Sequence, residues 1–455
     1  MNVRLVPDKQ WFRSRKGNGV LAGSPLTYFG VTDAGARILD AIETNSELPQ
    51  NHVQLTDRLL ATGAVHPLID HLVNPSDITV VIPAFVTNEH AHTNLAELVA
   101  GLSGLSIIVV DDASPYAINL PGIHVIRLAT NAGPSTARNT GINAVTTRLV
   151  ACIDADAVAT TKEILSLGAY LDDSRVGIVA PRINCAHDRT FINEFESHHS
   201  PLDLGEIQAL VRPMSRVSYV PAAVIVCNTQ SLQTVGLFDE SMRLGEDVDL
   251  VWRMIAARMW CRYVPAIQCV HRSRQSMRAM LKQRFDYGTS AASLDQRHPQ
   301  AASPLRAHAL ILTASTSLLM GYIYLAAVLA ALTLVYFMFS LRSTSLPIKV
   351  RAKLAWKGLT STTRLLADAV MRAWWPLFFL ASFFSIRLGA MLTFSALVPP
   401  IVGLVRNKPG HPIRYLIMRI LEDVAYGTGV WVGALRARSL RCLLPVITVR
   451  RSVVR

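Results

Sequence analysis

The sequence predicts an α/β domain with a doubly wound, mostly parallel sheet, preceded by a small N-terminal unit and followed by a basic, helical, membrane-associated region. Three observations support this. Apolar strand-like runs alternate with helical segments between residues 76 and 300. Residues 1–75 show a separate, shorter pattern, and residues 301–455 interleave long apolar stretches with Lys and Arg. These three ranges are the expected domains.

The N-terminal unit reads as a short hairpin followed by two helices. Ile38, Leu39 and Ile42 recur on one face of a predicted helix over residues 32–42. A second short helix is predicted over residues 53–61, and a Gly residue that suits a helix end follows it.

Polar residues end the apolar runs of the central region. The run that starts at Ile78 fits a buried parallel strand, as do SIIVVDDAS and RLVACIDADA further along. In such sheets, ligands bind at the carboxyl ends of the strands. We therefore expect Asp111, Asp112, Asp154 and Asp156 to gather at one binding edge.

Asp154 and Asp156 form a DxD pattern directly after a strand. In extended backbone the two carboxylates point to opposite sides, so one can face a ribose and the other a divalent cation that neutralises a diphosphate leaving group. Asp111 and Asp112 are expected to bond the base and ribose of a nucleotide. Because Asp also favours turns and caps, a purely structural role is the competing interpretation.

Gly133 opens a predicted helix, and its free amides together with Arg138 can meet phosphate or base edges. We also assign Pro83, at the end of the first central strand, to donor binding. A solvated Arg138 on a glycine-initiated helix is the alternative.

Asp247 follows Gly245 at the amino end of a predicted helix, where the helix dipole favours an ionised carboxylate. An ionised carboxylate can take a proton from an acceptor hydroxyl, which makes Asp247 the candidate general base. A single base opposite the leaving group implies inversion. Helix capping is the other interpretation.

Two weaker candidates follow in the sequence. His271 ends a strand-like run and is a candidate metal ligand, although a lone histidine there is often structural. Arg284 lies in QRFDYG, where it could grip a leaving phosphate as a donor-binding residue, or belong only to a membrane-proximal helix.

The net charge of +13 belongs wholly to the C-terminal part of the chain. Residues 341–455 hold 18 Lys and Arg against 3 Asp and Glu, while the rest of the chain holds 27 against 29. Cations beside apolar segments usually face the cytoplasm and anionic lipid head groups. The interleaved apolar stretches argue against a nucleic-acid-binding tail.

The six cysteines contain no CxxC pair and sit mostly in apolar runs, so we expect buried thiols without disulfides. The first 19 residues lack the apolar core of a secretory signal. We therefore expect a protein of the cell membrane whose catalytic domain faces the cytoplasm.

Residues 308–340 contain no Asp, Glu, Lys or Arg. As one helix they would measure roughly 50 Å, which exceeds a bilayer core. Two short crossings, or one crossing and an interfacial helix, fit better. A second apolar stretch, residues 374–405, is interrupted by Arg387 and by Pro399-Pro400, so a hairpin or a surface-lying pair is expected.

The ordered motifs IPAF, VVDDAS, GPSTARNTGI, DADA and GEDVDLVWR resemble those of the family 2 glycosyltransferases over about residues 78–290. The resemblance implies a GT-A fold, an inverting mechanism, a UDP-sugar donor, and Mg or Mn as the cation. It further implies that Asp112 binds uracil and ribose, that Asp156 binds the metal and that Asp247 is the base.

The opening LVPDKQW, the stretch RFDYG and the tail RYLIMRILEDVAYGTGVWVGALRARSLRCLLP resemble the glycosyltransferases of mycofactocin systems. That resemblance implies transfer of glucose from UDP-glucose, in β-1,4 linkage, onto a small peptide-derived redox cofactor precursor. It also implies that the N-terminal unit is similar to winged-helix peptide-recognition modules.

Two other functions remain open from the residues alone. A membrane polysaccharide synthase would carry a QxxRW motif, whereas this chain has QRFDY at Gln283–Tyr287; a lipid-linked sugar acceptor is a milder version of that alternative. A degenerate transferase that acts as a membrane scaffold would not need to keep Asp154, Asp156 and Asp247.

Overall fold

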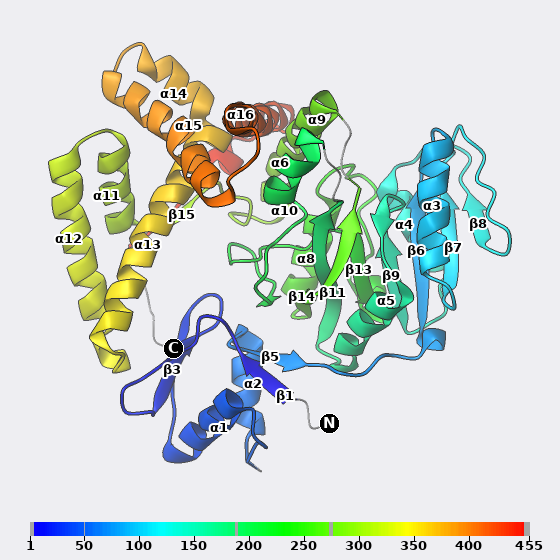
Figure 1. Ribbon diagram of the computed structural model, residues 1–455, viewed down its shortest axis with the longest axis horizontal. Coiled ribbons are helices and arrows are strands. Elements are labelled where there is room, and N and C mark those ends of the chain that lie inside the picture. The colour runs from blue at the N-terminus through cyan, green and yellow to red at the C-terminus, as the bar shows by residue number, and fades with distance from the viewer. Residues whose placement is uncertain (1–3, 50, 187–189, 273–275, 450–455) are drawn as a thin grey trace. The chain divides into compact units, whose positions relative to one another are not determined.

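Continuous apolar runs form the strands of the central sheet. The computed structural model describes residues 4–49, 51–186, 190–272 and 276–449, in two units that are described separately (Figure 1). Unit 1 consists of Met1–Val6 and Val65–Ser273, and unit 2 of Pro7–Ala64 and Arg274–Arg455.

The sheet of unit 1 is mixed and mostly parallel, in the order β10-β14-β11-β13-β9-β6-β7-β8, with β12 paired to β14. β13 runs antiparallel between β9 and β11. The strands are β6 (Ile78–Ala84), β7 (Ser106–Asp111), β8 (His124–Arg127), β9 (Leu149–Ile153), β10 (Ala157–Val158), β11 (Val176–Cys185), β12 (Ala209–Leu210), β13 (Val224–Asn228) and β14 (Trp260–His271).

Helices cover both faces of this sheet, as the alternating side chains of β6 require. Val80 and Ile82 pack into the core shared with Leu95 and Leu98 of α3. α4 approaches the opposite face so closely that a Cβ on Gly141 would lie 2.3 Å from a methyl group of Val81. The helices are α3 (Glu89–Gly101), α4 (Pro134–Asn143), α5 (Thr161–Gly168), α6 (Phe191–His199), α7 (Thr229–Val235) and α8 (Glu246–Ala256), with short 3-10 turns η1 (Pro75–Asp77) and η2 (Ala169–Asp172).

The predicted N-terminal hairpin and both predicted helices are present. Strands β2 (Phe12–Arg13), β3 (Gly19–Ala22) and β4 (Thr27–Gly30) form an antiparallel sheet, and β1 (Arg4–Pro7) pairs with β5 (Val65–Leu68). α1 (Asp33–Thr44) begins after Thr32, whose side chain accepts from the Gly35 amide. α2 (Val53–Thr62) ends at Gly63, where φ is 66°.

Apart from β2, β3 and β4, the described part of unit 2 is almost wholly helical, whereas β5 and most of β1 belong to unit 1. β15 (Arg306–His308) and β16 (Val446–Thr448) form the short parallel pair of unit 2. The helices are α9 (Met277–Thr289), α10 (Ala291–Arg297), α11 (Ala309–Leu319), α12 (Ile323–Ser340), α13 (Ile348–Ala369), α14 (Trp375–Ser382), α15 (Ile386–Asn407) and α16 (Pro412–Arg436). Two short 3-10 turns, η3 (Arg342–Thr344) and η5 (Arg441–Leu443), and a π-helical segment between α13 and α14, η4 (Val370–Trp374), complete this part of the chain.

Glycines let α9 and α16 pack with their backbones in contact. A Cβ on Gly288 would lie 2.1 Å from the Tyr426 carbonyl oxygen, and one on Gly429 would lie 2.0 Å from that of Phe285. Gly433 meets Thr289 in the same way. This contact explains why RFDYG and the glycine-rich tail motif need glycine.

Three helical stretches are long and apolar enough to cross a membrane: Ile323–Thr344, Ile348–Ser382 and Ile386–Asn407. The uncharged run 308–340 divides into α11 and α12 at Gly321, where φ is 79°. The second apolar stretch divides between α14 and α15. The expectation that Pro399-Pro400 also interrupts it is wrong, because α15 continues through both prolines.

Arg387 lies in the first turn of α15 rather than at its centre. Its guanidinium is 3.5 Å from the carbonyl oxygens of Met320 and Gly321, and it stacks on the Tyr322 ring at 4.5 Å. A cation at the C-terminal end of α11 satisfies carbonyls that have no helical partner. The charge of Arg387 therefore has hydrogen-bond acceptors and an aromatic ring as partners.

Candidate active site

Asp112 fixes the turn that starts α4. It follows the last residue of β7, and its carboxylate accepts the amides of Ala132 at 2.7 Å and Gly133 at 2.9 Å. Gly133 has a φ of 93°, which favours glycine, and α4 begins at the next residue. The Asp112 side chain thus shapes the loop that precedes the free amides of α4.

Asp111 is buried beside Asp112 and holds the next turn. Its carboxylate accepts the Ser114 amide at 2.8 Å and the Arg127 guanidinium at 2.5 Å. Ala113 has a φ of 56°, and the Ser114 hydroxyl accepts the Val86 amide at 2.9 Å. The VVDDAS motif is therefore a rigid loop at the carboxyl ends of β6 and β7.

Arg138 links two acidic segments that are distant in sequence. It projects from α4 and is almost completely buried. One guanidinium nitrogen lies 2.6 Å from Asp154 Oδ1 and the other lies 3.0 Å from Glu246 Oε1. Its Cζ lies 5.2 Å from the Phe238 ring centroid. Arg138 therefore joins the DxD segment to the segment of the predicted base.

Asp154 and Asp247 lie against consecutive residues of the chain. The Asp154 amide donates to the Ala223 carbonyl oxygen at 2.9 Å, and the Ala222 amide donates to Asp247 Oδ2 at 3.3 Å. β13 starts at the next residue, Val224, and pairs with Ile153 of β9. Because β13 is inserted beside β9, the two acidic segments meet at one edge of the sheet.

Burial sets the protonation of the carboxylates at the start of α8. It raises the pKa of Glu246 to about 7, the negative Asp247 next to it adds to the rise, and Arg138 opposes it. Burial also raises the pKa of Asp247, against the amides of Val248 and Ala222 and the charge of Arg138. A raised pKa suits a proton acceptor that works near neutral pH.

Burial would lower the pKa of Arg138, but the charges of Asp154 and Glu246 outweigh it and raise the pKa. Arg138 is therefore a permanent cation at the centre of this cluster.

Asp156 and His271 form a pair beside the cluster. Asp156 Oδ1 lies 3.1 Å from His271 Nε2. The two are held by backbone pairing, because Ala157 of β10 is the antiparallel partner of His271 of β14, and the Arg272 amide donates to the Asp156 carbonyl oxygen at 3.0 Å. The two DxD carboxylates thus have different partners, Arg138 for Asp154 and His271 for Asp156.

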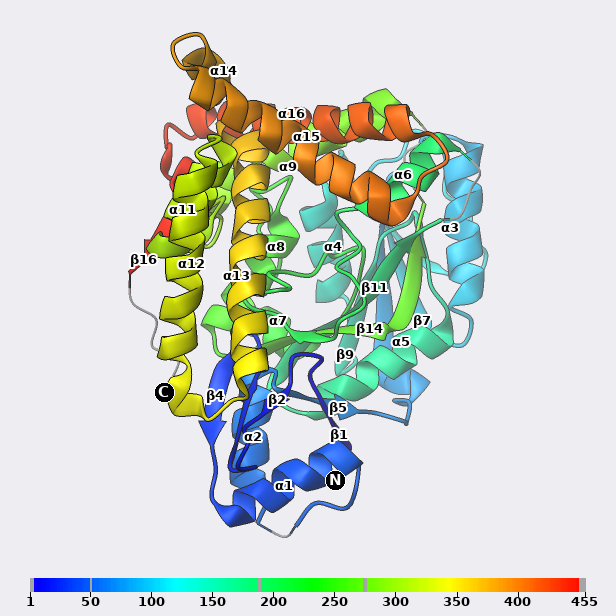
Figure 2. The same ribbon diagram turned by 60° about the vertical axis from the view of Figure 1, so that its left-hand side comes forward.

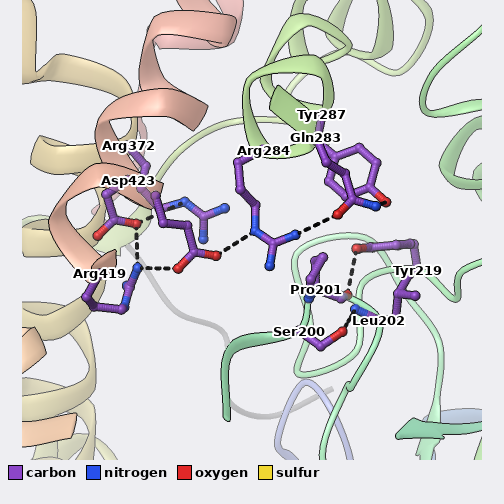
Figure 3. A network of polar contacts seen from close by, with 11 residues as sticks. Ser200, Pro201, Leu202, Tyr219, Gln283, Arg284, Tyr287, Arg372, Arg419 and Asp423 are labelled. Carbon is purple, nitrogen blue, oxygen red and sulfur yellow. Dashed lines mark hydrogen bonds and ion pairs between the residues drawn. The ribbon is translucent and has the colours of Figure 1, made fainter. Parts of the chain in front are cut away.

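The other two predicted residues, Pro83 and Arg284, each have partners in their own unit. Pro83 is in β6 and pairs with Val110 of β7, near the Asp111 turn. Arg284 belongs to α9 of unit 2, where it is buried and lies 2.7 Å from Glu422 of α16 (Figure 3). Arg419 binds the other Glu422 oxygen at 3.0 Å.

Sequence reasoning gave no role to Glu246 or to the loop before it. Asn139 of α4 donates to the Phe238 carbonyl oxygen and to Glu240, each at 2.9 Å, and the Ser135 hydroxyl donates to the Met242 carbonyl oxygen at 3.2 Å. These bonds fasten the segment before Glu246 to α4. The acidic residue next to Asp247 was the available signal, but its partner lies 108 positions earlier.

The matching family model is "Glycosyl transferase family 2", over residues 79–228, which covers β6 to β13. Two curated relatives from Mycobacterium tuberculosis, strains CDC 1551 / Oshkosh and ATCC 25618 / H37Rv, are named "Pre-mycofactocin glycosyltransferase". Each is 34% identical over 452 residues, which is 95% of this chain and 95% of the relative.

Solved structures with some likeness include the mannosyltransferase PcManGT from Pyrobaculum calidifontis in complex with GDP-Man and Mn2+. It is 14% identical, has a TM-score of 0.42, and the match covers 88% of this chain and 97% of that one. S. aureus TarS 1-349 in complex with UDP-GlcNAc is 16% identical with a TM-score of 0.38, over 50% of this chain and 68% of that one.

The mixed sheet, with its acidic loops at one edge and the family 2 match across it, defines the class of protein: a glycosyltransferase of family 2 with a GT-A fold. The identity along nearly the full length narrows this further. The chain belongs to the pre-mycofactocin glycosyltransferases.

Proposed function

We propose that this enzyme transfers glucose from UDP-glucose, with inversion, onto the peptide-derived redox cofactor precursor of a mycofactocin system. The bridge of Arg138 between Asp154 and Glu246 carries the proposal, because it puts the donor-side DxD segment next to the segment of Asp247. The names of the relatives support the acceptor class. Glucose and its β-1,4 linkage rest on the resemblance of the sequence motifs.

Asp247 acts as the general base in this proposal. Its carboxylate takes the proton of the acceptor hydroxyl, and the resulting oxygen attacks the anomeric carbon of the sugar. The bond from that carbon to the diphosphate breaks, and UDP leaves with the electron pair on the opposite side. The ring carbon is therefore inverted. The raised pKa of Asp247 makes it a stronger proton acceptor than an exposed aspartate.

The donor is held by the loops at the carboxyl ends of the strands. Asp112 and Gly133 shape the turn whose following amides face a phosphate or base, while Asp111 and Pro83 support the neighbouring loop. Asp154 is partly exposed and can accept a ribose hydroxyl while it keeps its bond to Arg138. Arg284 remains a proposed phosphate contact.

Asp156 and His271 would hold a divalent cation, Mg or Mn. Their donor atoms, one carboxylate oxygen and one imidazole nitrogen, lie 3.1 Å apart, which suits adjacent positions around one ion. In this proposal the two side chains supply only part of the coordination of the ion, and the diphosphate oxygens of the donor supply more of it. Such an ion would neutralise the charge of the leaving diphosphate.

The C-terminal helices would keep the enzyme at the cell membrane, with unit 1 on the cytoplasmic side, where nucleotide sugars are found. The cations of residues 341–455 support that side. The N-terminal strands and helices are the proposed peptide-recognition part.

The test is incubation of the full-length enzyme with UDP-glucose, Mg or Mn, and the cofactor precursor, followed by mass spectrometry. A ladder of hexose additions that disappears on chelation of the metal is the expected result. NMR of the product should show β-anomeric 1,4-linked glucose. Hexose on a polysaccharide or a lipid phosphate, with none on the precursor, would contradict the proposed acceptor.

A further inference from the structure

α12 and α13 form a hairpin in unit 2 whose two exposed faces have opposite chemistry. The short segment 341–347 joins them, and they lie side by side in both views (Figures 1 and 2). α12 contains no charged residue and exposes large apolar side chains along its whole length. They are Ile323, Tyr324, Leu325, Val328, Leu332, Val335, Tyr336 and Phe339.

α13 carries a line of exposed cations over the same length. Lys349, Lys353, Lys357 and Arg364 are all exposed, and Trp356 stands among them with 58% of its surface accessible. The buried side of α13 packs into the core that it shares with α11 and α12. The cations are therefore on the outside of the bundle and not in its interior.

The boundary between apolar and cationic surface thus runs parallel to the helix axes. α12 is 18 residues long, roughly 27 Å, close to the depth of a bilayer core. If α12 crossed the membrane, its neighbour would carry Lys353 and Lys357 through the hydrocarbon on a lipid-facing surface, which is costly for each lysine. A parallel boundary is typical of helices that lie in the membrane interface.

We propose that the α12–α13 hairpin lies in the plane of one leaflet. The apolar face of α12 enters the acyl region, and the cations of α13 contact the head groups of anionic phospholipids. Although α12 and part of α13 have the length and composition of spanning helices, this hairpin does not cross the bilayer. The proposal concerns attachment only and does not depend on the donor or acceptor.

Depth measurements on α12 test this arrangement. Single cysteines at Leu325, Leu332 and Phe339 lie on one exposed face of the helix, and the six native cysteines are buried. Nitroxide labels at these positions in the full-length protein, in vesicles with phosphatidylglycerol, should show the same immersion depth by EPR. A label at Thr360 of α13 should remain accessible to a water-soluble quencher.

Other depth patterns would overturn the proposal. A maximum at Leu332 would show a spanning helix, and a steady change from Leu325 to Phe339 would show insertion by one end. Labels that contact no lipid, and broaden one another between molecules, would show that a second copy of the chain covers the face.

The cations are tested by Lys→Gln changes at Lys349, Lys353 and Lys357. We expect roughly a fivefold loss of partitioning to anionic vesicles for each lysine, and on the order of a hundredfold for all three. Partitioning to neutral phosphatidylcholine vesicles should not change. The matched control removes the same charge from exposed positions outside the hairpin, with Lys9→Gln, Arg37→Gln and Lys162→Gln. Equal losses for both triple variants would refute a specific role for α13.

Discussion

Replacement of Arg138 by Met should destabilise unit 1 and should do so in a pH-dependent way. Removing one partner of a buried ion pair costs about 3–5 kcal/mol. Arg138 has two partners, whose side chains are 29% (Asp154) and 11% (Glu246) exposed. Burial raises the pKa of Glu246 to about 7, and the charge of Arg138 opposes a further rise. Without Arg138 the pKa of Glu246 should rise further, so Glu246 can become neutral at pH 7 and is then not left as a buried, unpaired charge.

The loss at pH 7 therefore falls mainly on Asp154, and we expect about 3 kcal/mol, the lower end of that range. It should grow as the pH rises above 7. In the variant the folded state keeps a proton on Glu246 that the unfolded state has lost, so rising pH favours unfolding. In the wild-type protein Glu246 loses its proton around pH 7, so this dependence fades as the pH rises above 7, whereas in the variant it continues to higher pH.

Denaturant unfolding of the full-length protein, followed between pH 6.5 and 8.5, measures both effects. Arg148→Met is the control, since Arg148 is 43% exposed and lies 3.1 Å from Asp172 at the surface of the same unit. It should cost less than about 1 kcal/mol. If Arg138→Met costs no more than this control, or if its cost does not change with pH, the Arg138 bridge does not stabilise the two acidic segments.

Three further changes test separate parts of the structure. The raised pKa of Glu246 should make the wild-type protein less stable as the pH rises from about 4.3 to 7, and Glu246→Gln should remove this fall in stability. Melting temperatures of both proteins at pH 5 and 7.5 measure the fall. If the variant loses as much stability between these pH values as the wild-type protein, Glu246 does not cause it. Gly429→Ala should lower the free energy of unfolding by about 1–3 kcal/mol, because the added Cβ would overlap α9. Gly358→Ala is the control: its Cβ would have its nearest neighbour at 3.9 Å, so this change should be neutral or slightly stabilising. Equal effects of the two changes would refute close packing of α9 and α16. Asp112→Asn should lower the free energy of unfolding by about 1–3 kcal/mol and weaken UDP-sugar binding, because the single amide oxygen can replace only one of the two carboxylate oxygens that accept the Ala132 and Gly133 amides. Calorimetry measures the affinity for the donor. An unchanged affinity would show that this turn is not part of the donor site.

The edge that carries the acidic residues was predictable because parallel strands end together. Asp112 follows β7 and Asp154 follows β9, so the apolar runs alone place both at the carboxyl end of the sheet. The burial of the six cysteines was also predictable from their apolar neighbours, and the structure confirms it.

The bridge through Arg138 could not be predicted, because it depends on tertiary pairing. It requires β13 to be inserted antiparallel beside β9, and no pattern in the chain marks that insertion. The same holds for Arg284 of α9, whose ion-pair partner in α16, Glu422, lies 138 positions later in the sequence. A sequence pattern predicts a residue's element and its exposure, but a pairwise contact over such a separation needs the fold.

The most direct test of the central claim, that a carboxylate beside the DxD segment activates the acceptor, is single-turnover transfer by Asp247→Asn. We expect transfer to fall by about 10²–10⁴-fold while the affinity for the donor stays within about twofold of the wild-type value. Asp70→Asn, an exposed carboxylate of the same unit, should transfer at the wild-type rate. Wild-type transfer by Asp247→Asn would show that the base lies elsewhere and would contradict the account.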